Sequence, residues 1–313
     1  MPNMRKCAII GCGNVGATTA YALLQSGLFS ELLLLDINKE RAVGEAEDLA
    51  HAMPFLSPAE VRAADYPDLA DTGLIIIAAG AAQRVGETRL DLVRKNTEIF
   101  RSIVESICRY NSDALLLVVT NPVDILTEVT RRLSGFPAHR VIGSGTVLDT
   151  ARLKHLLGRH LCVDPRQVHA FIIGEHGDSE LPVFSSANIS GIDLDHFCGT
   201  GCRECSGGDL DRLFTLARDA AYRIIRAKGS TYYAIAEAVR RIVTAIVRDE
   251  SAILPISVHT GGMYGIEGLS MSLPAMLGAS GVERMLEIPL SGEEKDALLR
   301  SAAQLRSVLD SVL

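Results

Sequence analysis

The sequence predicts an α/β protein in two parts, a doubly wound parallel sheet followed by a second, less regular α+β domain. Through the first half, short continuous apolar runs alternate with helical patterns, as expected of parallel strands that helices cover on both faces. After about residue 145 this alternation stops. We therefore expect one domain over residues 1–144 and a second over residues 145–313.

Each element of the two domains follows from its own run of residues. In the first domain the expected strands are CAII, LLLLD, LIIIAA, LLLVV and VIG, with helices over residues 15–26, 39–52 and 88–110. In the second domain the expected helices cover residues 148–161, 209–249 and 292–313, and the expected strands are VHAFIIG, LPVFSSANI and AILPISV. The segment FCGTGCRECSGGD is expected to be a loop rich in glycine and cysteine.

Composition and charge exclude several classes of protein. The 313 residues are 48% apolar, which is enough for a core, and carry a net charge of −7, which argues against binding to nucleic acid. No apolar run approaches the roughly 18–20 residues that span a bilayer, and the first residues do not resemble a signal peptide. The seven scattered cysteines do not form a disulfide pattern. These observations predict a cytoplasmic protein without membrane partners.

A glycine motif opens the chain. Gly11, Gly13 and Gly16 follow the pattern GxGxxG between a strand and a helix, and Asp36 ends the next strand 20 residues after Gly16. The glycines allow a tight turn, a close approach of pyrophosphate and close packing of helix on strand, while the carboxylate can accept both ribose hydroxyls and repel a 2′-phosphate. A Rossmann-type domain that binds NAD rather than NADP is predicted. The alternative is a structural turn with a helix-capping Asp.

Polar residues that could carry chemistry follow three other apolar runs. His176, in GEHGDSE, ends a strand on a glycine-lined turn and has a side chain suited to proton transfer near neutral pH. Asp149 and Arg152 share a helix face. Asn121, in TNPVD, lies where ligands bind in open α/β sheets. The alternatives are a structural histidine, a solvated surface ion pair and an ordinary turn.

Together these motifs resemble the NAD-dependent L-lactate and malate dehydrogenase family over nearly the whole chain. The motifs stand in the order of the family: GCGNVG, LLLLDIN, AAGAAQRVGETRLDLVRKN, TNPVDILT, GTVLDTARLK, IIGEHGDSE and KGSTYYAIA. Within the family, ETRLDL, GEHGDSE and STYYAIA are similar to the bacterial L-lactate dehydrogenases. The resemblance implies reversible hydride transfer between NADH and pyruvate, giving (S)-lactate and NAD, and it implies a homotetramer.

The resemblance also implies a role for each catalytic residue. His176 donates a proton to the keto oxygen, and Asp149 orients the imidazole and stabilises its charged form. Arg152 binds the substrate carboxylate with two parallel hydrogen bonds, which Lys cannot reproduce. Arg89, from a mobile loop, polarises the keto oxygen as charge develops there.

Further positions line the expected substrate and cofactor sites. Asn121 contacts both ligands, and Thr231 and Ile235 lie near the substrate side chain and the nicotinamide. The residues that the resemblance places around NAD are Gly11, Gly13, Val15, Gly16, Asp36, Arg41, Tyr66, Gly80, Ala81, Ser102, Thr120, Asn121, Ser144 and Ile235.

One position distinguishes lactate from malate enzymes in this family, the sixth residue before the catalytic arginine of the loop. Counting back from Arg89 gives Gln83, as in lactate enzymes, whereas malate enzymes carry Arg there; Arg84 is one position off. The family often has Pro where this chain has Val85. The second carboxylate of oxaloacetate would find no ion partner at Gln83. The alternatives are a solvated polar loop, a malate or other 2-hydroxy-acid dehydrogenase, and a non-catalytic NAD-binding protein.

Two other features point to a possible effector and to a possible metal. Many bacterial members bind fructose 1,6-bisphosphate through an Arg and a His. The matching positions here are Lys154, which replaces the usual Arg, and His169; the alternative is a surface Lys and a buried His.

Cys198, Cys202 and Cys205 have a spacing that occurs at metal sites. Because the family has a variable segment there without metal, we expect none.

Overall fold

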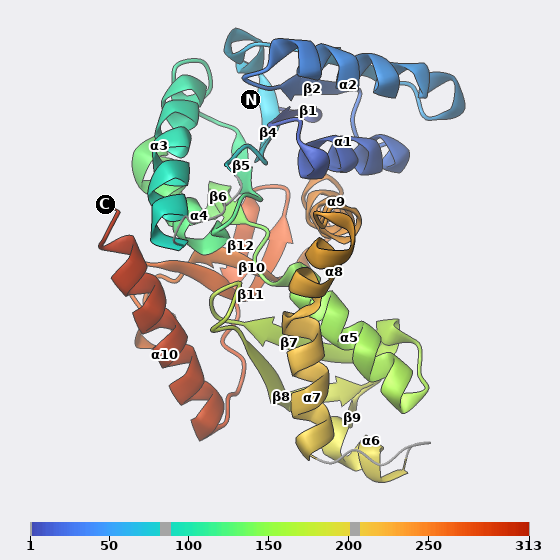
Figure 1. Ribbon diagram of the computed structural model, residues 1–313, viewed down its shortest axis with the longest axis vertical. Coiled ribbons are helices and arrows are strands. Elements are labelled where there is room, and N and C mark those ends of the chain that lie inside the picture. Colours follow the sequence, from blue (N-terminus) through green and yellow to red (C-terminus); the bar gives the residue numbers. More distant parts are fainter. Residues whose placement is uncertain (1, 82–88, 201–206, 313) are drawn as a thin grey trace.

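The computed structural model describes residues 2–81, 89–200 and 207–312. In this part of the chain one large sheet of nine strands has helices on both faces, and a smaller sheet of three strands lies toward one end of the molecule (Figure 1). The doubly wound arrangement and the less regular second part agree with the predicted fold class.

Six parallel strands form the first part of the large sheet. They are β1 (Asn3–Ile10), β2 (Glu31–Leu35), β3 (Glu60–Ala63), β4 (Thr72–Ile77), β5 (Leu115–Val118) and β6 (Val141–Gly143). Their order in the sheet is β6-β5-β4-β1-β2-β3, so the chain reverses its direction of winding between β1 and β4. Ligands of such sheets bind outside the carboxyl ends of the strands at this point.

Helices bury both faces of these strands. The helices of this part are α1 (Asn14–Ser26), α2 (Lys39–His51), α3 (Arg89–Cys108) and α4 (Val123–Ser134). Helices α3 and α4 pack together on one side, and α1 packs against α9 (Tyr233–Val247) on the other (Figure 1). The side chains of Leu74–Ile77 in β4 are fully buried, which explains why the strands are continuous apolar runs.

Three antiparallel strands from the second half extend the same sheet beyond β6. They are β10 (Ala252–His259), β11 (Ser270–Gly278) and β12 (Gly281–Met285). Strand β10 joins β6 through the pairing of Ser257 with Gly143. A Cβ atom at Gly143 would lie 2.8 Å from the Cβ of Ser257, so the junction needs glycine. The extension was not predicted from the sequence.

The smaller sheet belongs to a unit with its own hydrophobic cluster. The sheet contains β7 (Val168–Ile173), β8 (Leu181–Ile189) and β9 (Ile192–Asp193), and the helices beside it are α5 (Val147–Leu161), α6 (Leu194–Thr200) and α7 (Gly207–Arg218). Leu153, Leu157 and Ile172 are fully buried in this cluster. Helix α10 (Gly292–Leu309) contacts both β8 and α4.

Several expected elements differ from the structure. The single helix expected over residues 209–249 is wrong, because the chain forms α7, α8 (Ala220–Lys228) and α9; Gly229, with φ of 88°, ends α8. Helix α4 and the strands β3, β11 and β12 were not predicted. Short 3-10 helices cover Met53–Phe55, Tyr66–Leu69, Ala138–Arg140, Pro165–Gln167 and Met263–Gly265.

The segment expected to be a loop rich in cysteine is partly helical. Cys198 lies in α6 and is buried in the hydrophobic cluster of the smaller unit, so the expected loop is wrong there. Cys202 and Cys205 lie outside the described residues. The five cysteines that the structure describes are free thiols. Among the described helices, none is long and apolar enough to cross a membrane.

Candidate active site

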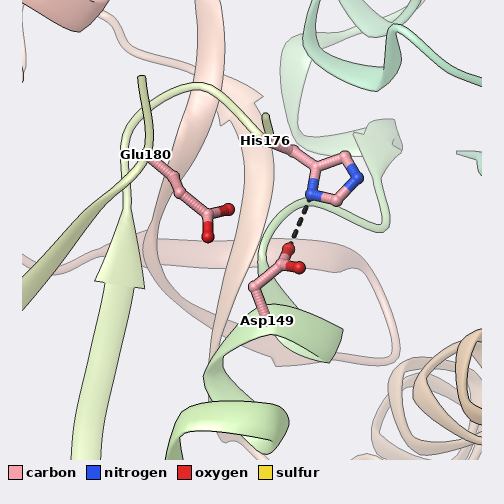
Figure 2. A group of neighbouring side chains, drawn as sticks. All are labelled: Asp149, His176 and Glu180. Atoms are coloured by element: carbon pink, nitrogen blue, oxygen red, sulfur yellow. Dashed lines mark hydrogen bonds and ion pairs between the residues drawn. The ribbon is translucent and has the colours of Figure 1, made fainter. Parts of the chain in front are cut away.

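A histidine, a carboxylate and a guanidinium form a chain of contacts between α5 and the segment that follows β7. Nδ1 of His176 lies 2.6 Å from Oδ2 of Asp149, and Nη1 of Arg152 donates to Oδ1 of Asp149 at 2.7 Å (Figure 2). The side chain of Asp149 is 2% exposed and that of Arg152 is 14% exposed. The alternative of a solvated surface ion pair is therefore wrong.

The backbone of the turn that carries His176 is attached to three other elements. The N–H of His176 donates to Oδ2 of Asp124 in α4 at 2.7 Å, and the N–H of Glu175 donates to Oγ of Ser301 in α10 at 2.8 Å. Gly174 exchanges two backbone hydrogen bonds of 2.9 Å with Ser272 in β11. These contacts fix the position of the imidazole, and the role of Asp124 was not predicted.

The charges of this group favour a protonated histidine. Burial favours the neutral imidazole, but the charge and hydrogen bond of Asp149 outweigh burial and raise the pKa of His176 to about 9. Despite burial, the charges of His176 and Arg152 keep the pKa of Asp149 below its usual value. With Nδ1 engaged by Asp149, Nε2 is the nitrogen that can donate a proton to a ligand.

A second carboxylate beside this pair was also missed. Glu180, in the quoted motif GEHGDSE, is buried just before β8, and its ligand atom, that of His176 and that of Asp149 all lie within 4.8 Å of one another (Figure 2). Three such groups could hold a metal ion by spacing alone. A metal at both Nδ1 of His176 and Oδ2 of Asp149 would replace their 2.6 Å hydrogen bond. The absence of a metal remains a prediction.

The turn between β1 and α1 has the shape that a pyrophosphate requires. Gly11 has φ of 101°, and a Cβ there would lie 2.4 Å from the backbone nitrogen of Ala79. A Cβ at Gly16 would lie 1.8 Å from the carbonyl oxygen of Gly11, so α1 packs so closely on the turn after β1 that only glycine fits there. A Cβ at Gly13, the N-cap of α1, would have no described atom within 4 Å. Gly13 thus leaves open space at the N-terminus of α1, and anions bind at helix N-termini.

Asp36 is held beside this turn by two backbone hydrogen bonds. Oδ2 accepts from the N–H of Cys12 at 2.7 Å, and Oδ1 accepts from the N–H of Asn38 at 2.9 Å. The carboxylate is half-buried at the end of β2. A fixed anion at this place fits ribose hydroxyls and disfavours a 2′-phosphate, so the residues present fit NAD.

Asn96 connects the loops that follow β4 and β5. Its Oδ1 accepts from the N–H of Ala81 at 2.8 Å, and its Nδ2 donates to the carbonyl oxygen of Asn121 at 2.9 Å. Thr120 donates from Oγ1 to the carbonyl oxygen of Ala79 at 2.7 Å. The predicted positions Ala81, Thr120 and Asn121 are thus brought together at the carboxyl edge of the sheet, by a buried residue that was not predicted.

The other predicted positions are spread over several elements. Val15 lies in the first turn of α1, Ser144 is buried after β6, Gly80 follows β4, and Tyr66, Thr231 and Ile235 are half-buried. Arg41 and Ser102 are exposed on α2 and α3. Gln83, Arg84 and Val85 lie outside the described residues, and Arg89 is described only as the first residue of α3.

Both halves of the chain match family models. Residues 5–143 match the NAD-binding domain of lactate/malate dehydrogenases, and residues 146–313 match their α/β C-terminal domain. The chain belongs to the lactate/malate dehydrogenase family. This result confirms the resemblance stated from the motifs, and with it NAD as the cofactor and the class of oxidoreductase.

Relatives within the lactate/malate dehydrogenase family are similar over their whole length. The L-lactate dehydrogenase of Acetivibrio thermocellus is 50% identical over 310 residues, which cover 99% of this chain and 98% of the relative. An L-lactate dehydrogenase of Thermoanaerobacter is 51% identical over 309 residues, which cover 99% of both chains.

Solved structures of lactate dehydrogenases have the same fold. One, from a Medee basin deep-sea metagenome library, has a TM-score of 0.96 and 42% identity and covers 100% of this chain and 99% of its own. The minor L-lactate dehydrogenase of Enterococcus mundtii has a TM-score of 0.94 and 39% identity, over 99% of this chain and 98% of its own. The predicted fold class is confirmed.

Proposed function

We propose that this dehydrogenase reduces pyruvate to (S)-lactate with NADH, and catalyses the reverse reaction, at the group formed by His176, Asp149 and Arg152. The observation that carries the proposal is the chain of contacts from imidazole to buried carboxylate to guanidinium. The names of the relatives, L-lactate dehydrogenases at about half identity, support this choice of substrate.

Each residue of the group has a distinct task. NADH, when bound, supplies the hydride that reaches the carbonyl carbon. His176 gives the proton on Nε2 to the keto oxygen, and Asp149 holds the ring through Nδ1 and stabilises the imidazolium until that proton leaves. Arg152 uses one N–H for Asp149 and has further N–H groups for the substrate carboxylate. In the oxidation of lactate, His176 takes the hydroxyl proton.

The arrangement proposed for the ligands follows the two parts of the chain. Residues 1–144 bind NAD through Gly11, Gly13 and Asp36, and residues 145–313 bind the 2-oxo acid. We assign polarisation of the keto oxygen to Arg89 and choice of the substrate side chain to Gln83, both from the family motif.

The direct test follows the absorbance of NADH with pyruvate and, separately, with oxaloacetate. We expect turnover with pyruvate that exceeds turnover with oxaloacetate. Faster oxidation of NADH with oxaloacetate would make this a malate enzyme, and no oxidation with any 2-oxo acid would favour a protein that only binds NAD.

The substitution Gln83→Arg tests the assignment of the substrate side chain. We expect the ratio of kcat/KM for oxaloacetate to that for pyruvate to rise at least about tenfold, because the second carboxylate gains a charged hydrogen bond. Arg84→Gln is the matched control, since it changes charge at the next residue and is expected to leave the ratio unchanged. An unchanged ratio in Gln83→Arg contradicts the assignment.

We also propose that the enzyme is a homotetramer activated by fructose 1,6-bisphosphate through Lys154 and His169. Lys154 is half-buried, and burial lowers its pKa, whereas His169 is exposed on β7, so the alternative of a buried histidine is wrong. Saturation with pyruvate, measured with and without the bisphosphate, tests activation; an equal half-saturation excludes it.

Sedimentation velocity tests the tetramer. A cytoplasmic location remains a prediction from the cysteines.

A further inference from the structure

Glu180 is a buried carboxylate to which the family motif assigns no role in the reaction proposed above. It lies just before β8 and is 5% exposed. Figure 2 shows its carboxylate directed toward the pair formed by Asp149 and His176. Its carboxylate therefore lies close to both the imidazole of His176 and the carboxylate of Asp149.

One oxygen of the Glu180 carboxylate is buried without a hydrogen bond, although the charges of His176 and Arg152 and the backbone N–H of Gly177 favour the ionised group. Its Oε1 is buried and has no hydrogen-bond partner among the described residues. By contrast, both oxygens of Asp149 are engaged, one by His176 and one by Arg152. A buried and unpaired carboxylate oxygen beside an imidazole has no evident structural use, because it costs free energy that an apolar side chain would avoid.

We propose that Glu180 is a positioning residue of the proton relay, whose carboxylate controls how long His176 remains protonated as the pH rises. This role rests on the proposed function, since it acts on the proton that His176 gives to the 2-oxo acid. Glu180 does not exchange protons with substrate; it acts through the charge on His176.

The charges around the pair come from each element packed against it. Helix α5 contributes Asp149 and Arg152, α4 contributes Asp124, and the turn itself contributes Glu175 and Glu180. Burial and the charge of Asp149 raise the pKa of Glu180, so this carboxyl ionises close to the range in which His176 loses its proton. Once ionised, Glu180 is a second counter-ion that retains the proton on His176.

Removal of this charge has opposite consequences for the two directions of the reaction. Reduction of pyruvate requires protonated His176, and oxidation of lactate requires the neutral form. In Glu180→Gln we expect the midpoints of both pH profiles of kcat/KM to fall by on the order of one pH unit. At pH 9, where Glu180 is ionised in the wild type, pyruvate reduction then falls several-fold while lactate oxidation does not fall. At pH 7, where Glu180 in the wild type holds a proton and carries no charge, both directions change little. A merely structural defect would lower both directions at every pH.

The experiment compares pH profiles of kcat/KM in both directions for the wild type, Glu180→Gln and Glu180→Asp. The aspartate variant keeps a charge at a greater distance, so we expect its midpoints to lie between the other two. Asp178→Asn is the matched control: it removes an acidic residue of the same turn that is exposed, and it is expected to leave both profiles unchanged.

The outcomes separate the two proposals. Profiles of Glu180→Gln that coincide with the wild type, or an equal loss in both directions, overturn the role of Glu180. A wild type that does not reduce pyruvate overturns the proposed function instead. If Glu180→Gln does not fold, NMR titration of the His176 imidazole in Glu180→Asp and in the wild type tests the same shift, and equal midpoints there also overturn it.

Discussion

Two buried glutamates of this enzyme each lie beside a histidine, and yet their pKa values are shifted in opposite directions. Glu128, in α4, is 1% exposed and accepts hydrogen bonds from Arg131 at 2.7 Å, from Arg132 at 2.8 Å and from Ser270 at 2.9 Å. Burial alone would raise its pKa, but these donors outweigh burial and lower the pKa of Glu128 to about 2. Glu180, with an unpartnered oxygen, has its pKa raised.

The difference shows that burial alone does not decide the charge of a carboxyl group. At Glu128 the donors saturate both oxygens, so the group is an anion at every physiological pH and connects α4 to β10 and β11 through His259 and Ser270. At Glu180 the donors are too few, so the group can still take or release a proton near neutral pH. The first cluster stabilises the fold, and the second is suited to chemistry.

The largest effect is expected from exchanging the histidine of each cluster for asparagine. His176→Asn should lower kcat by roughly 10²–10⁴-fold, because the proton donor is lost. His259→Asn changes the histidine that lies 3.2 Å from Glu128, and it should change kcat less than about threefold, as expected away from the reacting atoms. Steady-state kinetics at saturating NADH measures both. Equal losses would mean that the two clusters do not differ in function.

The two glutamates should also differ in what they contribute to folding. Glu128→Gln should lower the free energy of unfolding by about 2 kcal/mol, because charged hydrogen bonds are lost and the half-buried guanidinium of Arg131 is left without its anion. Glu180→Gln removes a carboxylate for which burial and repulsion by Asp149 outweigh the attraction of His176 and Arg152, so at pH 8 it should raise stability by on the order of 1 kcal/mol. Urea denaturation with a common m-value measures both, and a destabilised Glu180→Gln would contradict the contrast.

The two glutamates should change the stability of the fold in opposite directions as the pH changes. The pKa of Glu128 is lowered from 4.5 to about 2, so its contribution is present above pH 4.5 and is lost as the pH falls toward 2. The pKa of Glu180 is raised, so it weakens the fold as the pH rises above 4.5. We expect Glu128→Gln to flatten the loss of stability between pH 4.5 and about 2, and Glu180→Gln to flatten the loss of stability between pH 4.5 and about 8. Thermal melting between pH 3 and pH 9 tests this.

The smallest effect on stability is expected at the surface pair of Asp164 and Arg166, in which the carboxyl has a lowered pKa like that of Glu128 but is exposed. Arg166 donates to both oxygens of Asp164 and holds the pKa of that carboxyl at about 2. Both residues are exposed, where water screens the pair. Arg166→Gln should leave Tm unchanged within experimental error. A clear drop in Tm would mean that exposure does not separate this pair from the Glu128 cluster.

The residues alone allowed the prediction of groups that lie within one motif, and the family resemblance added the contact of Asp149 with His176; other groups that meet only in the fold were missed. Asp149 and Arg152 are one helical turn apart, and His176 follows a recognisable strand. Asp124 lies outside these motifs. It accepts a hydrogen bond from the backbone N–H of His176, 52 residues away in the chain, and no sequence pattern indicates that contact. The buried Asn96 similarly reaches Asn121 from 25 residues away.

The fold has the same limit. Five of the six parallel strands were predicted because a strand buried on both faces is a continuous apolar run, whereas the edge strand β3 is only half-buried and was missed. The strands β10, β11 and β12 join the same sheet through an antiparallel pairing to β6, and apolar character alone does not specify a partner strand. The break between α8 and α9 depends on the conformation of Gly229, while helical periodicity continues on both sides of it.

The pairing of Gly143 with Ser257 has a consequence for anyone who divides this enzyme into fragments. The two family models meet near residue 145, yet the sheet runs without interruption across that boundary. A fragment ending there would present the fully buried residues Val141 and Ile142 on a bare strand edge, the kind of edge that templates aggregation. Chimaeras with other dehydrogenases should therefore exchange β10 together with β6, so that these two paired strands come from the same parent protein.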